Sequence, residues 1–146
     1  MATNMDRDAI RDAYEDVRSN LTDTEWVVFK FESSEIVVAA KGSGFEDFRQ
    51  QFLDDERAFG YIRIQMGDEM SKRCKFLFLT WIGCDVGVMQ RAKMSTDKSI
   101  MKEVISNFAA ELTAECEADM DLNYFMEVLQ KAQGANYGTG IRNEEN

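Results

Sequence analysis

The segment FLFLTWI at positions 76–82 restricts the fold more than any other, because six of its seven residues are apolar. A strand with one exposed face alternates apolar and polar residues, whereas this segment carries hydrophobic side chains on both faces. Such a strand needs cover on both sides, as at the centre of a sheet between two layers of helices. Gly83 ends the run. The segment therefore predicts a central strand in an α/β (mixed α+β) fold.

The rest of the sequence alternates between helix and strand patterns. Apolar residues at three- and four-residue spacing predict an amphipathic helix at 6–18. The longest helical pattern covers 86–112, where the weak helix formers Ser95, Thr96 and Asp97 predict a break or kink. In chain order we expect a helix at 6–18, a hairpin of strands at 26–31 and 36–38, a helix at 45–53, a strand at 61–66, the central strand, a helix at 86–112, a short strand at 114–116 and a helix from 122 that ends near Gly134.

This element order predicts one domain built on a mixed sheet with helices on both faces. A chain of 146 residues can bury one substantial core, and no linker or internal repeat divides it. We therefore expect a single domain over residues 1–137 and a flexible polar tail at 138–146. The start lacks the pattern of a signal peptide, and no apolar run approaches 18 residues. These features favour a cytoplasmic protein.

The sequence excludes several classes of catalytic and metal site. It contains no histidine, which removes histidine general bases, nucleophile pairs that depend on histidine and histidine metal sites. Cys74, Cys84 and Cys116 are odd in number and form no C-x-x-C pair, so neither a disulfide framework nor a zinc ribbon is expected. No pair of carboxylates stands out in an apolar setting. We expect no catalytic residue, no metal and no cofactor.

Charge is distributed unevenly along the chain, which has 17 basic and 27 acidic side chains and a net charge of −10. Residues 71–102 reverse this balance with seven basic and two acidic side chains, a local charge of +5. A basic region on an acidic protein can steer one acidic partner into one orientation. The overall charge argues against nucleic acid as that partner. The alternative is that these are ordinary solvated charges. The basic residues are Lys72, Arg73, Lys75, Arg91, Lys93, Lys98 and Lys102.

Helical geometry groups some of these residues. At about 100° per residue, Arg91, Lys98 and Lys102 fall within about 40° of one another, opposite the apolar stripe of the long helix. We expect them to form one solvent-facing basic ridge. A second group, at 72–75, lies where the central strand begins, beside a turn. Spacing alone leaves open whether the two groups share one surface.

Several short segments, in this order and spacing, resemble coactosin-type members of the ADF/cofilin homology (ADF-H) family. The likeness extends from about residue 2 to residue 137. It implies an ADF-H fold with a central mixed sheet of five or six strands, and binding to the side of actin filaments without catalysis. The segments are KRCKF at 72–76, TWIG at 80–83, QRAK at 90–93, TDK at 96–98, KEV at 102–104 and GANY at 134–137.

The resemblance also implies which residues bind actin. Lys75 matches a filament contact at the start of the central strand, with Lys72 and Arg73 beside it. Arg91 and Lys93 match a basic pair at the start of the long helix. We expect Lys98, Lys102 and Lys131 to bind actin as well. Acidic patches on actin would attract such residues, because ammonium groups on a rigid strand can meet carboxylates at modest entropic cost.

Other features refine the expected function. The long helix is shorter than in cofilin, and the Ser-Gly start typical of cofilin is absent. These departures favour filament protection or competition with cofilin over severing, with weak or no binding of monomeric actin. We expect a monomer at the cytoskeleton that binds neither nucleic acid nor membranes. The alternative is a scaffold or inhibitor that docks on an acidic surface of a non-actin enzyme, for example a lipoxygenase, where Lys131 matches an implicated position.

Overall fold

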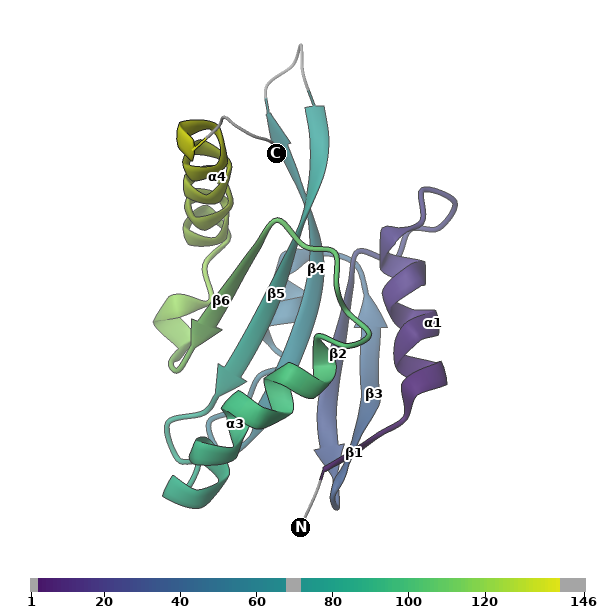
Figure 1. The fold of residues 1–146 in the computed structure, drawn as a ribbon, viewed down its shortest axis with the longest axis vertical. Helices are drawn as coiled ribbons and strands as arrows, with labels where there is room; N and C mark the ends of the chain where they lie inside the picture. The colour runs from purple at the N-terminus through teal and green to yellow at the C-terminus, as the bar shows by residue number, and fades with distance from the viewer. Residues whose placement is uncertain (1–2, 68–71, 140–146) are drawn as a thin grey trace.

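The computed structural model describes residues 3–67 and 72–139, which form one mixed sheet between two layers of helices (Figure 1). The strand order is β1-β3-β2-β4-β5-β6. The β1–β3 and β5–β6 pairs are parallel and the other pairs antiparallel. The elements are β1 (Asn4–Met5), α1 (Arg7–Arg18), β2 (Trp26–Glu32), β3 (Glu35–Gly42), α2 (Phe45–Arg49), β4 (Arg57–Gly67), β5 (Lys72–Ile82), α3 (Val88–Met101), β6 (Ala110–Ala114), a 3₁₀ turn (Glu117–Asp119) and α4 (Leu122–Thr139).

The strand β5 has the double-sided cover that its sequence predicts. It pairs with β4 over its whole length and with β6 through its second half. Phe78 packs into a core beneath α1 and α3, whereas Leu77, Leu79 and Trp81 pack into a second core beneath α2 and α4. The two cores lie on opposite faces of the sheet, so the prediction of a strand buried on both faces is confirmed.

The first helix and the hairpin are also confirmed. The Asp6 side chain caps α1 by accepting a hydrogen bond from the backbone N–H of Ala9. The helix buries the apolar face that its spacing predicts, with Ile10 and Val17 fully enclosed. The strands β2 and β3 pair antiparallel as predicted, although both are longer than the apolar runs alone indicate.

The long helix is shorter than predicted, and it has no break. The helix α3 ends at Met101 and continues through 95–97. Asp97 does not interrupt it, because its buried carboxylate accepts a hydrogen bond from Arg57 of β4 at 2.8 Å. Val104 and Ile105 are buried as expected, but they lie after the helix. The chain then forms β6, which lies at 110–114 rather than 114–116 because it pairs with β5.

Other boundaries differ as well. The strands β4 and β5 begin earlier than predicted, at Arg57 and Lys72, since each is the other's pairing partner throughout. The helix α2 ends at Arg49, before the predicted residue 53. The helix α4 continues past Gly134 and Gly138 to Thr139, because each glycine costs a helix only about 1 kcal/mol. Residues 140–146 of the expected tail lie outside the described residues.

Gly83, which follows β5, approaches the chain before β4 too closely for any side chain. An added Cβ would lie 2.1 Å from the backbone oxygen of Asp54. We expect Gly83→Ala to lower the free energy of unfolding by about 1–3 kcal/mol, because the backbone must move. Urea denaturation measures the change. Gly87→Ala is the control, because no heavy atom lies within 4 Å of its added Cβ. An equal loss in both variants would contradict the explanation.

Candidate interaction surface

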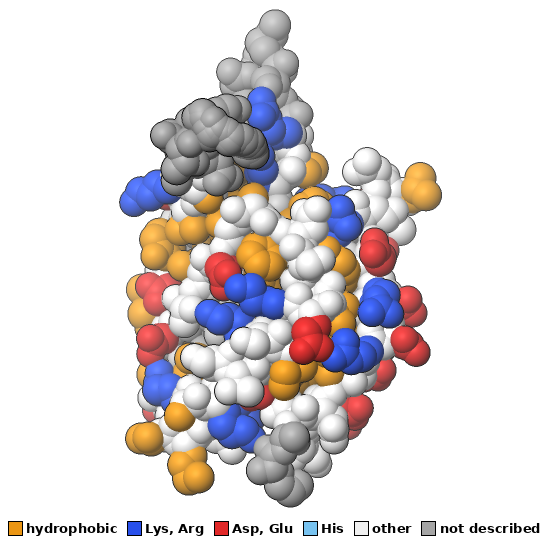
Figure 2. All heavy atoms as spheres, viewed as in Figure 1, with side chains coloured by type: hydrophobic (Ala, Val, Ile, Leu, Met, Phe, Trp, Pro, Cys, Tyr) orange, Lys and Arg blue, Asp and Glu red, His pale blue; other side chains and the backbone are white. Residues whose placement is uncertain are grey.

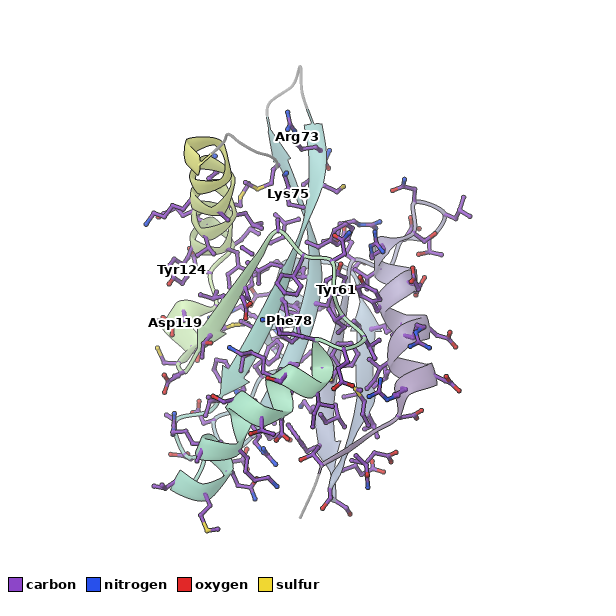
Figure 3. The ribbon with its side chains drawn as sticks, in the orientation of Figure 1. Tyr61, Arg73, Lys75, Phe78, Asp119 and Tyr124 are labelled. Atoms are coloured by element: carbon purple, nitrogen blue, oxygen red, sulfur yellow. The ribbon has the colours of Figure 1, made fainter. Side chains whose placement is uncertain are left out.

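The first basic group lies at the paired ends of β4 and β5, which reach about as far as the end of α4 (Figures 1 and 3). We call Lys72, Arg73 and Lys75 the strand-end cluster. The side chain of Lys72 lies outside the described part of the structure. Arg73 is exposed and Lys75 half-buried, and they stand opposite Met66 and Ile64 of β4. The paired strands thus hold two cations on a rigid support at the end of the sheet.

The alternation of side chains along β5 fixes the direction of this cluster. Leu77 faces the core beneath α2 and α4, so Lys75 and Arg73, two and four residues earlier, face the same side. Lys131 is exposed on α4, which covers that side of the sheet. The structure therefore places Arg73, Lys75 and Lys131 on one side of the molecule, an arrangement that neither spacing nor charge predicts.

The basic ridge on α3 does not face open solvent. Its residues point toward β6, where Arg91 pairs with Glu115 at 2.5 Å. Lys102 and Lys98 both pair with Glu111, at 2.6 and 3.6 Å. Figure 2 shows basic and acidic side chains next to one another over α3 and β6. The expectation of a solvent-facing ridge is wrong, because β6 returns beside α3 and brings two carboxylates with it.

Glu111 has an altered acidity in this environment. Its partial burial raises the pKa of the carboxyl group. Hydrogen bonding and attraction from Lys102, together with the charge of Lys98, outweigh the burial, and the net pKa lies below the usual glutamate value. The carboxylate therefore stays ionised and continues to neutralise both lysines at mildly acidic pH.

The remaining predicted cations are less restrained. Lys93 is half-buried, on the side of α3 away from the ridge. Among the described residues, Lys75, Lys93 and Lys131 have no carboxylate within 4.0 Å. These three lysines can pair with an external acidic group without first losing an internal ion pair.

The two basic groups do not form one patch. The strand-end cluster lies at the start of β5, and α3 begins beyond the other end of the same strand (Figure 1). Lys98 and Lys102 pair with Glu111, which lies opposite Phe78 in the middle of β5. At about 3.3 Å per residue they therefore lie roughly 17 Å along the strand from Arg73, and on the other face of the sheet. A partner that contacts both groups must therefore extend along this length.

Comparison with known proteins identifies the family to which this chain belongs. Residues 2–130 match the family model described as "Cofilin/tropomyosin-type actin-binding protein". The chain belongs to this family. The coactosin-like protein of Bos taurus is 44% identical over 137 residues, which cover 94% of this chain and 96% of that relative.

Solved structures of the family confirm the expected fold. A crystal structure of human coactosin-like protein matches with a TM-score of 0.86 and 42% identity, covering 89% of this chain and 99% of that one. The solution structure of mouse coactosin, described as an actin filament binding protein, matches with a TM-score of 0.79 and 42% identity over 97% of this chain and all of that one. The six-stranded mixed sheet with helices on both faces is the ADF-H fold that the sequence predicts.

One feature of this family member was missed by sequence reasoning. Val88 and Met89 in the first turn of α3 are 83% and 82% exposed. Hydrophobic side chains stand out at this end of the molecule in Figure 2. The helical period places both residues at least about 120° from the buried Met94 and Met101, which is the signal that could have identified them. Exposed apolar side chains of this kind mark interaction surfaces.

One cluster of potential metal ligands lies on the described surface. Asp54, Cys84 and Asp85 bring their ligand atoms within 4.8 Å of one another, but all three residues are exposed. Desolvation and the two carboxylates raise the pKa of the Cys84 thiol. All three cysteines are free and exposed.

No described helix is both long and apolar enough to cross a membrane.

Proposed function

We propose that this protein binds the side of actin filaments as a coactosin-type member of the family, without catalysis. The observation that carries the proposal is Lys75, a lysine without an internal ion pair among the described residues, held with Arg73 on a rigid end of the sheet. Membership of an actin-binding family and 42% identity to a mouse actin filament binding protein supply the partner. The net charge of −10 supports a single orientation, since most of the surface repels an acidic partner.

The separation of the two basic groups supports filaments over monomers. Arg73 and Lys75 face one side of the sheet and the lysines of the ridge lie on the other, so two neighbouring subunits of a polymer can contact both groups more readily than one flat surface of a single subunit can. We assign the strand-end cluster, Lys93 and Lys131 to direct contact, with Val88 and Met89 as an apolar contact on α3. Arg91 belongs to the same surface, but Glu115 neutralises it. Lys98 and Lys102 also belong to this surface, but Glu111 neutralises them.

The effect on filaments follows from the shared fold. By analogy of fold, we infer that this protein occupies the filament site that cofilin uses and so excludes cofilin from it. We therefore propose competition with cofilin and protection of filaments rather than severing, by a monomeric protein at the cytoplasmic actin cytoskeleton. The 14-residue α3 is consistent with this role, since a helix shorter than that of cofilin is one of the two departures that the resemblance implies.

Sedimentation with filamentous and monomeric actin, with and without cofilin, tests the function. The protein should pellet with filaments, bind monomers weakly or not at all, and be displaced by cofilin. Raising the salt should release it, because the Debye length falls from about 10 Å at 0.1 M to about 3 Å at 1 M. Protein that stays in the supernatant at saturating filament concentrations would contradict the proposal.

The alternative function is docking on an acidic surface of a non-actin enzyme such as a lipoxygenase. The observation in its favour is Lys131, which is exposed on α4 and pairs with no described carboxylate. A pull-down with Lys131→Ala distinguishes the two functions. Loss of enzyme binding with unchanged filament binding would assign Lys131 to the second partner alone.

A further inference from the structure

The acidic residues that face α3 from β6 are placed there by the register of the sheet. Glu111 lies opposite Phe78 of β5 and points to the same face, whereas Ala110 and Leu112 point to the core beneath α2 and α4. The alternation along a strand therefore directs Glu111 toward the layer that contains α3. This position depends on pairing between β5 and β6, so it is a property of the fold and not of a flexible loop.

Glu111 engages both lysines at once. Its two carboxylate oxygens lie 2.6 Å from Nζ of Lys102 and 3.6 Å from Nζ of Lys98. The side chains of these residues are 31–37% exposed, so a large partner can still reach them. One carboxylate that neutralises two cations competes directly with any external carboxylate that approaches the same cations.

We infer that Glu111 is an internal competitor that limits the affinity of this protein for its acidic partner and the contribution of Lys98 and Lys102 to binding. The inference rests on the proposed function, since it assumes that the partner approaches α3. The pair contributes little to folding, because ion pairs with this degree of exposure stabilise a protein only slightly. Its effect is therefore expected in binding and not in stability.

The test is Glu111→Gln, which keeps the shape of the side chain and removes its charge. We expect this variant to bind actin filaments about two- to fivefold more tightly than the wild type at low salt, as one or two exposed cations become available. The gain should disappear at high salt. Adding Lys102→Gln to Glu111→Gln should remove most of the gain, since the released cation is then lost.

The matched control is Glu15→Gln, which removes one negative charge from the exposed side of α1. It should leave filament affinity within about 1.5-fold of the wild type at the same salt. Equal gains in both variants would overturn the inference, because net charge alone would then explain them. Unchanged or weaker binding by Glu111→Gln would also overturn it. Urea denaturation must show the same stability for all variants.

The proposed function and the inference fail in different ways. If the wild type does not sediment with filaments, both are overturned. If the wild type binds, and charge reversal at Lys75 weakens binding while Glu111→Gln has no effect, the inference is overturned and the proposed function stands.

Discussion

Lys75→Glu should lower the affinity for actin filaments at least about tenfold, the largest effect on binding that we expect from a single substitution. The wild-type lysine is held by β5 and pairs with no described carboxylate, so its charge is available to the partner. The substitution replaces attraction by repulsion at the same rigid position. Quantitative sedimentation at low salt measures the loss, and a tenfold change corresponds to about 1.4 kcal/mol.

The control for this prediction is Arg11→Glu. Arg11 is exposed on α1, and its reversal changes the net charge by the same amount. We expect it to weaken binding less than about twofold, because its position is outside the proposed surface. Equal losses in the two variants would indicate that overall charge, rather than the strand-end cluster, governs binding. Unaltered binding by Lys75→Glu would contradict the assignment of that residue.

Asp97→Ala should destabilise the fold by about 3–5 kcal/mol, the largest effect on stability that we expect. The Asp97 side chain is 1% exposed and pairs at 2.8 Å with Arg57, which is itself only 11% exposed and lies 3.8 Å from the centre of the Phe31 ring. Removal of the carboxylate leaves a buried guanidinium without its ion pair. The loss is a large part of the 5–15 kcal/mol typical of a whole domain. Urea denaturation measures it.

The double variant Arg57→Met/Asp97→Leu distinguishes a lost ion pair from lost packing. It replaces the pair with apolar side chains and should recover most of the stability, since such replacements are often neutral. Thr96→Ala, at an exposed position in the same helix, should change the stability by less than about 0.5 kcal/mol. A loss below about 1 kcal/mol in Asp97→Ala would show that Arg57 finds another partner or water.

The helices and strands show which structural features the local sequence pattern predicts. The strand β5 and the helix α1 were predicted because apolar residues mark both faces of the first and one stripe of the second. The end of α3 was not, because apolar residues at 104 and 105 continue the helical spacing although the chain has already turned. Asp97 was taken for a helix breaker because its partner Arg57 lies 40 residues away in the chain.

The candidate surface likewise has some features that the sequence predicts and others that depend on the tertiary structure. The sequence identified its cations, and helical geometry correctly placed Arg91 with Lys98 and Lys102 on one side of α3. It could not reveal that Glu111 and Glu115 face them, because this depends on the pairing of β6 with β5. The exposed Val88 and Met89 went unnoticed because apolar residues in a helix are usually buried.

The sequence by itself determined the family, the layered mixed sheet and the presence of a basic region on an acidic chain, since these depend on residue type and local spacing. Only the tertiary structure decided which cations remain available to a partner. That availability depends on Coulomb interactions over a few ångströms between residues distant in sequence, and folding alone brings those residues together.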